Sequence, residues 1–213
     1  MKKYSTYLFD FDYTLADSSR GIIICFRHVL ERHGYTISND EAIKRTIGKT
    51  LEESFTILTG ITDAETLAAF RREYVKEADI YMTANTILFP ETLEVLNRLK
   101  QRNAKIGIVS TKYRYRIMEL MSSYVPENFF SIIVGGEDVK THKPSPEGLM
   151  YAIDQLESDR QQTLYIGDST VDAETARNAS IDFWGVLHGA TTREELSIYP
   201  NIGISNDLYS LVL

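Results

Sequence analysis

Short apolar runs alternate with amphipathic stretches along most of this chain. Residues 4–9 are aromatic and apolar enough to predict a first strand. After Pro90 the alternation continues, and Leu93, Leu96 and Leu99 are spaced as on one face of a helix. Further strands are predicted at 105–109, 131–134, 163–166, 182–186 and 202–204. Short apolar strands that alternate with helices are typical of a parallel, doubly wound sheet, so the pattern predicts an α/β fold.

The stretch from residue 17 to about residue 84 has a different character, because its apolar residues recur only at helical spacing. A first helical run is expected to end at Gly34. Three Ser/Thr-x-x-Glu sequences, the pattern of a helix N-terminus, then begin at Ser38, Thr50 and Thr62. We therefore expect residues 17–84 to form an all-helical insertion in an α/β core made of residues 1–16 and 85–213.

The overall composition narrows the function. The chain has 213 residues, of which 43% are hydrophobic and 25% are charged, and its formal net charge is −7 at pH 7. This acidic balance argues against general binding to nucleic acids or anionic membranes, and the apolar runs are far shorter than the ~18 residues of a membrane span. Cys25 is the single cysteine, so an internal disulfide and a cysteine zinc site are excluded. We therefore expect a cytoplasmic protein with Cys25 as a buried structural thiol.

Polar residues follow the predicted strands, where ligands bind in open parallel sheets. Asp10 and Asp12 follow the strand at 4–9, and Ser110 and Thr111 follow the strand at 105–109. Asp168 and Asp172 follow the strand at 163–166. Four carboxylates at one sheet edge would repel one another and raise one another's pKa values, a conflict that a divalent cation removes. Because these ligands are all oxygens and few are offered, the expected ion is Mg²⁺ rather than Ca²⁺. The expected metal ligands are Asp10, Asp12, Asp168 and Asp172.

The spacing Asp10-x-Asp12 suits phosphoryl transfer. Residues two apart in an extended stretch point the same way, so one carboxylate can attack while the next handles protons. Asp10 as nucleophile, Asp12 as acid and base, and Lys143 with Mg²⁺ as neutralising charges supply what the reaction needs, through an aspartyl-phosphate intermediate. Ser110 and Thr111 are expected to donate hydrogen bonds to the phosphate oxygens, together with N–H groups at the following helix N-terminus.

Four motifs resemble those of the haloacid dehalogenase-like superfamily, in the family's order and over essentially the whole chain. They are Phe-Asp-Phe-Asp-Tyr-Thr-Leu-Ala-Asp-Ser at 9–18, Ile-Val-Ser-Thr at 108–111, Lys143 within His-Lys-Pro-Ser-Pro at 142–146, and Gly-Asp-Ser-Thr-Val-Asp at 167–172. The resemblance implies a Rossmann-like core with a mobile cap, which the family places between its first two motifs, where residues 17–84 lie. It also implies that the backbone carbonyl of Asp12 joins Asp10 and Asp168 at the metal.

Within this superfamily the chain looks most like the phosphoglycolate phosphatases. The Thr-Leu-x-Asp-Ser run at 14–18 and the Val-Gly-Gly-Glu run at 134–137 carry that likeness. The resemblance implies a Mg²⁺-dependent phosphoric monoester hydrolase that acts on a small phosphorylated metabolite. Dehalogenases of the family lack the second acidic residue of the first motif, so Asp12 favours phosphate esters. A pyrophosphatase of the same branch is the closest alternative, followed by a β-phosphoglucomutase-like phosphotransferase.

Three residues outside the catalytic positions are expected to set specificity, namely Tyr13, Arg20 and Lys49. The first stands where the family most often has glycine, the second begins the first cap helix, and the third lies in a loop that the resemblance places near the substrate. Lys112 is expected to raise the local positive potential, Arg114 and Arg116 to lie on a solvated helix face, and His142 to line the cleft. The sequence leaves a monomer and a homodimer both open.

Overall fold

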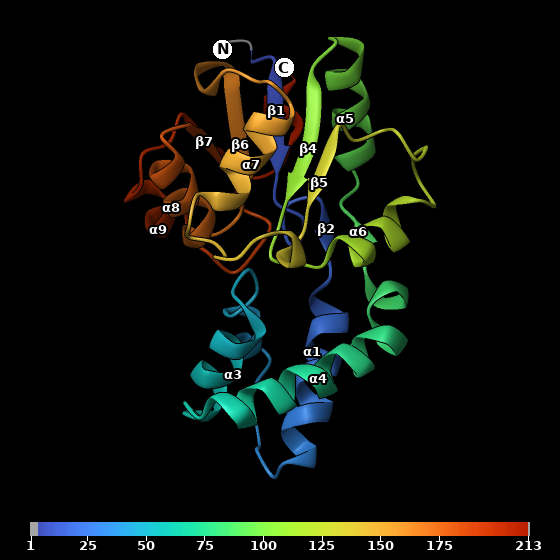
Figure 1. Cartoon of the computed structure of the whole chain (residues 1–213), viewed down its shortest axis with the longest axis vertical. Coiled ribbons are helices and arrows are strands. Elements are labelled where there is room, and N and C mark those ends of the chain that lie inside the picture. Colours follow the sequence, from blue (N-terminus) through green and yellow to red (C-terminus); the bar gives the residue numbers. More distant parts are fainter. Residues whose placement is uncertain (1–3, 213) are drawn as a thin grey trace.

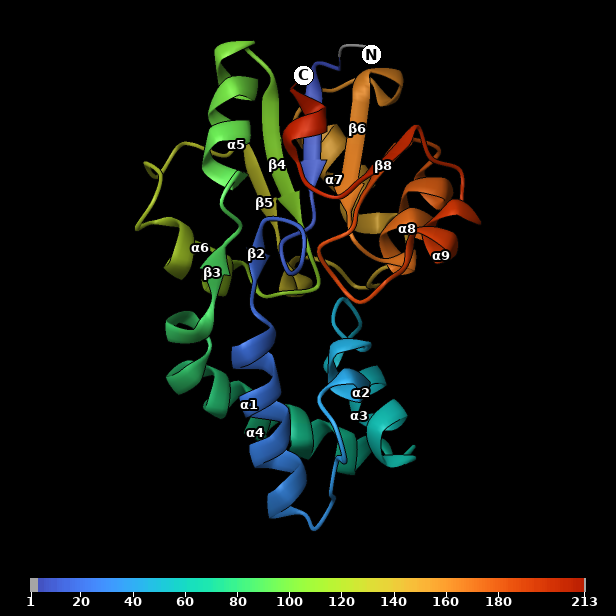
Figure 2. The same ribbon diagram turned by 180° about the vertical axis from the view of Figure 1, so that it is seen from behind.

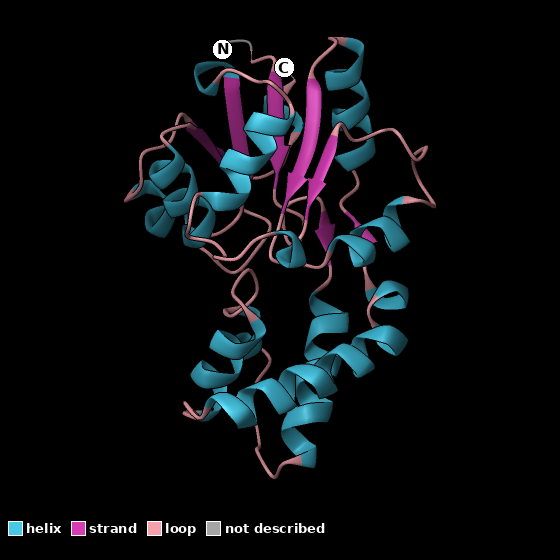
Figure 3. Ribbon diagram, in the orientation of Figure 1, coloured by secondary structure: helices cyan, strands magenta, loops and turns pink. Residues whose placement is uncertain are grey.

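The computed structural model describes residues 4–212, and the core of this part of the chain is a six-stranded parallel sheet (Figures 1 and 3). In spatial order its strands are β5 (Ile132–Val134), β4 (Lys105–Val109), β1 (Thr6–Phe9), β6 (Thr163–Gly167), β7 (Asp182–Val186) and β8 (Gly203–Ser205). The chain begins at the centre of the sheet and winds to both sides. This is the order of a doubly wound sheet, so the predicted Rossmann-like α/β fold is confirmed.

Alternate residues of the central strands point to opposite faces of the sheet and so define two helical layers. The helices of the core are α5 (Thr92–Gln101), α6 (Arg114–Met121), α7 (Glu147–Gln155), α8 (Thr170–Ala179) and α9 (Arg193–Ser197). Leu8 and Tyr165 pack on the face that α7, α8 and α9 cover, whereas Phe9 and Ile166 pack on the face that α5 and α6 cover. The strands read as nearly continuous apolar runs because both faces are buried.

A group of helices lies beyond the carboxyl ends of the strands (Figure 1). Its members are α1 (Ser19–Arg32), α2 (Glu41–Lys44), α3 (Leu51–Thr59) and α4 (Ala64–Tyr81). These helices bury a core of their own, in which the ring of Phe26 lies 4.8 Å, centroid to centroid, from the rings of both Phe55 and Tyr74. The part of the chain from α1 to α4 thus forms helices with a core of their own.

Two short strands join this helical group to the core. β2 (Ala16–Asp17) precedes α1, β3 (Ile87–Leu88) follows α4, and the two pair in an antiparallel ribbon (Figure 2). Short 3₁₀ turns complete the regular structure at Thr83–Asn85, Gly136–Asp138, Arg160–Gln162 and Tyr209–Leu211. Among residues 4–212, no helix is long and apolar enough to cross a membrane.

Only one of the three predicted helix N-termini is correct. Thr50 caps α3, because its hydroxyl accepts a hydrogen bond from the Glu53 N–H at 3.2 Å. The predictions at Ser38 and Thr62 are wrong, since α2 begins after Asp40 and α4 begins after Asp63. At α4 the Asp63 carboxylate accepts from the Thr66 N–H at 2.8 Å, and a carboxylate is favoured at a helix N-terminus.

The register of the sheet brings the polar residues of the motifs to one edge. Phe9 of β1 lies between Ile108 of β4 and Ile166 of β6, so the residues that follow these strands emerge side by side. The Asp10 N–H continues the ladder by donating to the Ile166 carbonyl at 2.9 Å. The loop between α2 and α3 reaches toward this edge from the helical group (Figure 1).

The C-terminus of α8 offers a test of the local structure. Ser180 ends this helix in the left-handed region, with φ 56°, where glycine carries no Cβ penalty. Ser180→Gly is expected to raise the free energy of unfolding by about 0.5 to 1 kcal/mol in urea denaturation. Ser122 ends α6 at φ −60°, so Ser122→Gly is expected to lower it by a similar amount. Equal destabilisation by both substitutions would contradict this reading of the α8 terminus.

Candidate active site

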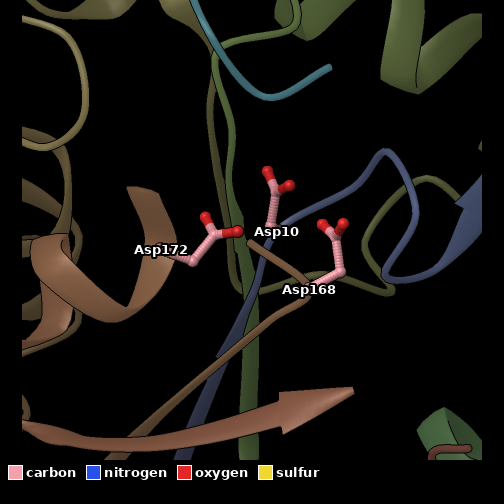
Figure 4. Close-up of side chains that lie close together, drawn as sticks. All are labelled: Asp10, Asp168 and Asp172. Carbon is pink, nitrogen blue, oxygen red and sulfur yellow. The ribbon is translucent and has the colours of Figure 1, made fainter. Parts of the chain in front are cut away.

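Three buried carboxylates converge at the carboxyl edge of the sheet (Figure 4). Asp10 follows β1, Asp168 follows β6, and Asp172 lies in the first turn of α8. One oxygen of each lies within 4.8 Å of the others. The three residues are 1%, 5% and 0% exposed, so water does little to screen their mutual repulsion.

Lys143 is the cation set against this cluster. Its Nζ lies 2.9 Å from Asp10 Oδ1 and donates to Asp172 Oδ1 at 2.6 Å and to the Tyr165 hydroxyl at 3.2 Å. Lys143 is itself buried, so its ammonium group has little access to water. The side chain therefore ties the residue after β1 to the first turn of α8.

Asp172 belongs to the cap of α8 and is also a partner of Lys143. Its Oδ2 accepts from the Ser169 N–H at 3.1 Å and from the Ser169 hydroxyl at 2.6 Å, which completes the capping box of α8. Its Oδ1 faces Lys143. The helix cap thus fixes the direction in which the second oxygen points.

The electrostatics of the cluster favour an additional cation. Burial raises the pKa of Asp10 to about 6, with a further contribution from Asp172 and Asp12, and Lys143 opposes the rise. Burial and the charge of Asp172 also raise the pKa of Asp168 well above its ordinary value. One ammonium therefore does not offset three buried carboxylates. The oxygen-only donor set fits Mg²⁺, which would supply the missing positive charge.

Asp12 lies apart from the other three carboxylates, so the predicted cluster of four is a cluster of three. Lys112 donates to Asp12 Oδ1 at 3.0 Å, and the Ser18 hydroxyl donates to the same oxygen. The chain turns sharply after Phe11, whose carbonyl accepts from three backbone N–H groups of the turn, so residues 10 and 12 do not share an extended strand. The side chain of Asp12 therefore faces Lys112 and Ser18 and is not part of the group of three.

Ser110 and Thr111 lie beside the cluster, after β4. The Ser110 hydroxyl accepts from the Lys112 N–H at 3.3 Å, and the side chain is buried. The Thr111 hydroxyl donates to the Gly48 carbonyl at 3.2 Å, in the loop between α2 and α3. Thr111 therefore connects the core directly to the helical group.

A cavity of about 520 Å³ lies between this edge of the core and helices α1, α3 and α4. Asp12, Thr111, Lys112 and His142 line it on the core side, so the prediction that His142 lines the cleft is confirmed. On the helical side the lining includes Lys49, whose Nζ also donates to Glu53 Oε1 at 3.0 Å.

The other two predicted specificity residues do not line the cavity. Arg20 is exposed, and nothing in the structure brings it to the cleft. Tyr13 is buried and has φ 57°, a left-handed conformation that glycine adopts without strain. Its effect here is on the turn that follows Asp12.

Arg116 lies in the cavity wall, although the sequence predicted it on a solvated helix face. The prediction of a solvated position is wrong, because Arg116 is 7% exposed, donates to Asp79 of α4 and lines the cavity. Its partner is distant in the sequence, so the contact cannot be read from the pattern of α6. The one available signal is that Arg116 lies one helical turn from Leu120, which is buried.

Comparison with known proteins confirms the resemblance seen in the four motifs. Residues 7–186 match the haloacid dehalogenase-like hydrolase family. Pyrophosphatase PpaX of Oceanobacillus iheyensis is 31% identical over 176 residues, which cover 83% of this chain and 80% of the relative. Phosphoglycolate phosphatase of Photorhabdus laumondii is 28% identical over 215 residues, which cover 96% of this chain and 90% of the relative.

A solved structure gives the same result. The crystal structure of a haloacid dehalogenase-like hydrolase from Bacteroides fragilis is 62% identical to this chain, with a TM-score of 0.97. The match covers 98% of this chain and 100% of that one. The chain therefore belongs to the haloacid dehalogenase-like hydrolase family and is a hydrolase.

Proposed function

We propose that this protein is a Mg²⁺-dependent phosphatase that hydrolyses a small phosphorylated metabolite through an aspartyl-phosphate intermediate. The observation that carries the proposal is the buried cluster of Asp10, Asp168 and Asp172 with the Lys143 ammonium against Asp10. A nucleophile held beside a fixed cation, at a site that needs a further cation, suits attack on a phosphate ester.

Asp10 is the proposed nucleophile. Its carboxylate attacks phosphorus, and Lys143 neutralises charge on the phosphate oxygens while it holds Asp10 in place. The Ser110 hydroxyl donates a hydrogen bond to the same oxygens, and the Thr111 hydroxyl does so once it has released the Gly48 carbonyl. Asp12 protonates the leaving oxygen and then takes a proton from the water that hydrolyses the aspartyl-phosphate.

The metal would be held by Asp10, Asp168 and Asp172, with the backbone carbonyl of Asp12 added by resemblance to the family. Mg²⁺ supplies positive charge for the phosphate oxygens when it is bound. The capping box of α8 would hold the ligand oxygen of Asp172 in position. Asp168 would offer a carboxylate oxygen of its own from the end of β6.

We propose that residues 17–84 act as a cap domain over this site. The loop between α2 and α3 supports this, because its Gly48 carbonyl accepts from Thr111 and Lys49 lines the cavity. Closure of such a cap excludes bulk water during the reaction. We place the enzyme in the cytoplasm, in keeping with the free, buried Cys25.

The relatives suggest the first substrates to assay, pyrophosphate and phosphoglycolate. A phosphotransferase of the β-phosphoglucomutase type is distinguished by the fate of the phosphate. Phosphate found on an acceptor sugar would support it, whereas free phosphate supports the phosphatase proposal.

Removal of the nucleophile is expected to abolish turnover. Asp10→Asn should lower kcat for p-nitrophenyl phosphate by about 10⁴-fold or more, because no other group can form the covalent intermediate. Asp154→Asn, an exposed change on α7, serves as the control and should leave kcat unaltered. Substantial turnover by a folded Asp10→Asn protein would exclude Asp10 as the nucleophile.

Removal of one charge from the cluster is expected to raise the thermal stability of the metal-free protein and to abolish its stabilisation by Mg²⁺. The raised pKa of Asp168 means that its ionised form is disfavoured in the folded protein, so it destabilises the metal-free protein at pH above the ordinary carboxyl range. Asp168→Asn should therefore raise Tm at pH 7.5 without metal and have little effect at pH 4.

Mg²⁺ should raise Tm of the wild-type protein and fail to raise that of Asp168→Asn, since the variant loses a metal ligand. Differential scanning calorimetry with and without EDTA measures both effects, and Asp154→Asn again serves as the control. An equal response to Mg²⁺ in the wild-type protein and in Asp168→Asn would remove Asp168 from the metal site.

A further inference from the structure

The cavity beside the site is much larger than the substrates for which the relatives are named. Its volume is about 520 Å³, within the ~300–1,000 Å³ range of pockets that enclose drug-sized ligands. Phosphoglycolate and pyrophosphate would each fill a small part of it. Because the cavity adjoins Asp12, the space lies on the side where the proposed acid would meet the leaving group.

This volume is not the result of a cap that stands away from the core. The Thr111 hydroxyl already donates to the Gly48 carbonyl at 3.2 Å. Arg71 of α4 donates to the Tyr113 hydroxyl, and Arg116 of α6 donates to Asp79 of α4. The helical group and the core thus touch on several sides of the cavity while it remains open inside.

Apolar and aromatic side chains make up about half of the cavity lining. Four phenylalanine and tyrosine rings belong to it, those of Phe26, Tyr74, Tyr113 and Tyr115. The first two pack 4.8 Å apart on the helical side, and the last two lie 5.9 Å apart at the core side. A ligand gains free energy from burial of its own apolar or aromatic surface against such side chains.

The charges of the lining are already compensated. Its four cations are Lys49, Arg71, Lys112 and Arg116, and three carboxylates line the same cavity. Each cation also lies against an acid, with N–O distances of 3.0 Å for Lys49–Glu53, 3.4 Å for Arg71–Glu52 and 3.0 Å for Lys112–Asp12, and with Asp79 as the partner of Arg116. A second anionic group on the substrate would have to displace one of these acids.

Polar residues are also present in the wall. His142 lines the cavity from the core side, and Thr46, Thr50 and Ser54 belong to the lining on the helical side. Aromatic walls with a small number of polar groups are typical of a pocket for an organic ligand.

From these observations we propose that the substrate is a phosphate monoester whose organic part is an uncharged, ring-bearing body about the size of a nucleoside, without a second anionic group. This inference rests on the proposed phosphatase activity and names the substrate class of the same site. The phosphate lies at Lys143, outside the cavity lining, and the ring extends past Asp12 to Tyr74 and Tyr115 in the cavity. The organic part can be a nucleoside or a simple aromatic alcohol, because both are uncharged and carry a ring.

The experiment compares phosphate release from esters that share a primary-alcohol leaving group, so that leaving-group acidity stays nearly constant. The esters are ethyl, 2-phenylethyl and 2-(1-naphthyl)ethyl phosphate, nucleoside 5′-monophosphates and phosphoglycolate, with pyrophosphate assayed in parallel. We expect kcat/KM for the ring-bearing esters to exceed that for ethyl phosphate and phosphoglycolate by about 10-fold or more. A preference for nucleoside monophosphates over the aryl-alkyl esters would identify the nucleoside as the source.

A matched pair of variants on α4 locates the effect in the cavity. Val75→Phe places a ring inside the cavity, whereas Ile80→Phe makes the same kind of change at a position that is 67% exposed. The ratio of kcat/KM for 2-phenylethyl over ethyl phosphate should fall about 10-fold in Val75→Phe and stay unchanged in Ile80→Phe.

The outcomes separate the two proposals. Equal or faster hydrolysis of ethyl phosphate, phosphoglycolate or pyrophosphate by the wild-type enzyme overturns the substrate class and leaves the phosphatase proposal standing. An unchanged ratio in a folded Val75→Phe protein also overturns it. Release of no phosphate from any ester in the presence of Mg²⁺ contradicts the phosphatase proposal itself.

Discussion

Three carboxylates buried against a single ammonium are the constraint on which the rest of the site depends. The strands β1 and β6 end side by side, so Asp10 and Asp168 emerge next to each other whatever their sequence neighbours are. Asp172 joins them because the capping box of α8 fixes its side chain. Burial of this much negative charge is costly without a cation, and that cost is the physical basis of the proposed metal site.

The same helix cap also shows how stability and function share residues here. Ser169 satisfies one oxygen of Asp172 at the N-terminus of α8, and Lys143 takes the other. The turn after Asp10 likewise fixes the direction of the Asp12 side chain. It directs that carboxylate away from the cluster and toward Lys112. The proposed nucleophile and the proposed acid are therefore close in sequence but surrounded by different charges, which suits their different tasks.

Much of the core could be predicted from the sequence because parallel strands end at one edge. That rule alone brings Asp10 and Asp168 to one place, and the helical spacing within residues 17–84 predicts the helices found there. Lys143 lies in the connection between β5 and α7, so the rule does not place it. The direction of Asp12 was not predictable in this way, because a tight turn replaces the extended strand that the spacing suggested. The burial of Arg116 was missed since its partner Asp79 lies on another helix, and only tertiary packing brings the two together.

We propose that a divalent cation compensates the buried carboxylates. An anomalous difference map from a crystal of this protein soaked with Mn²⁺, used as a probe for Mg²⁺, tests this directly. We expect one strong peak bounded by oxygens of Asp10, Asp168 and Asp172. A map with no peak among these oxygens, at a Mn²⁺ concentration that supports phosphate release, would contradict it.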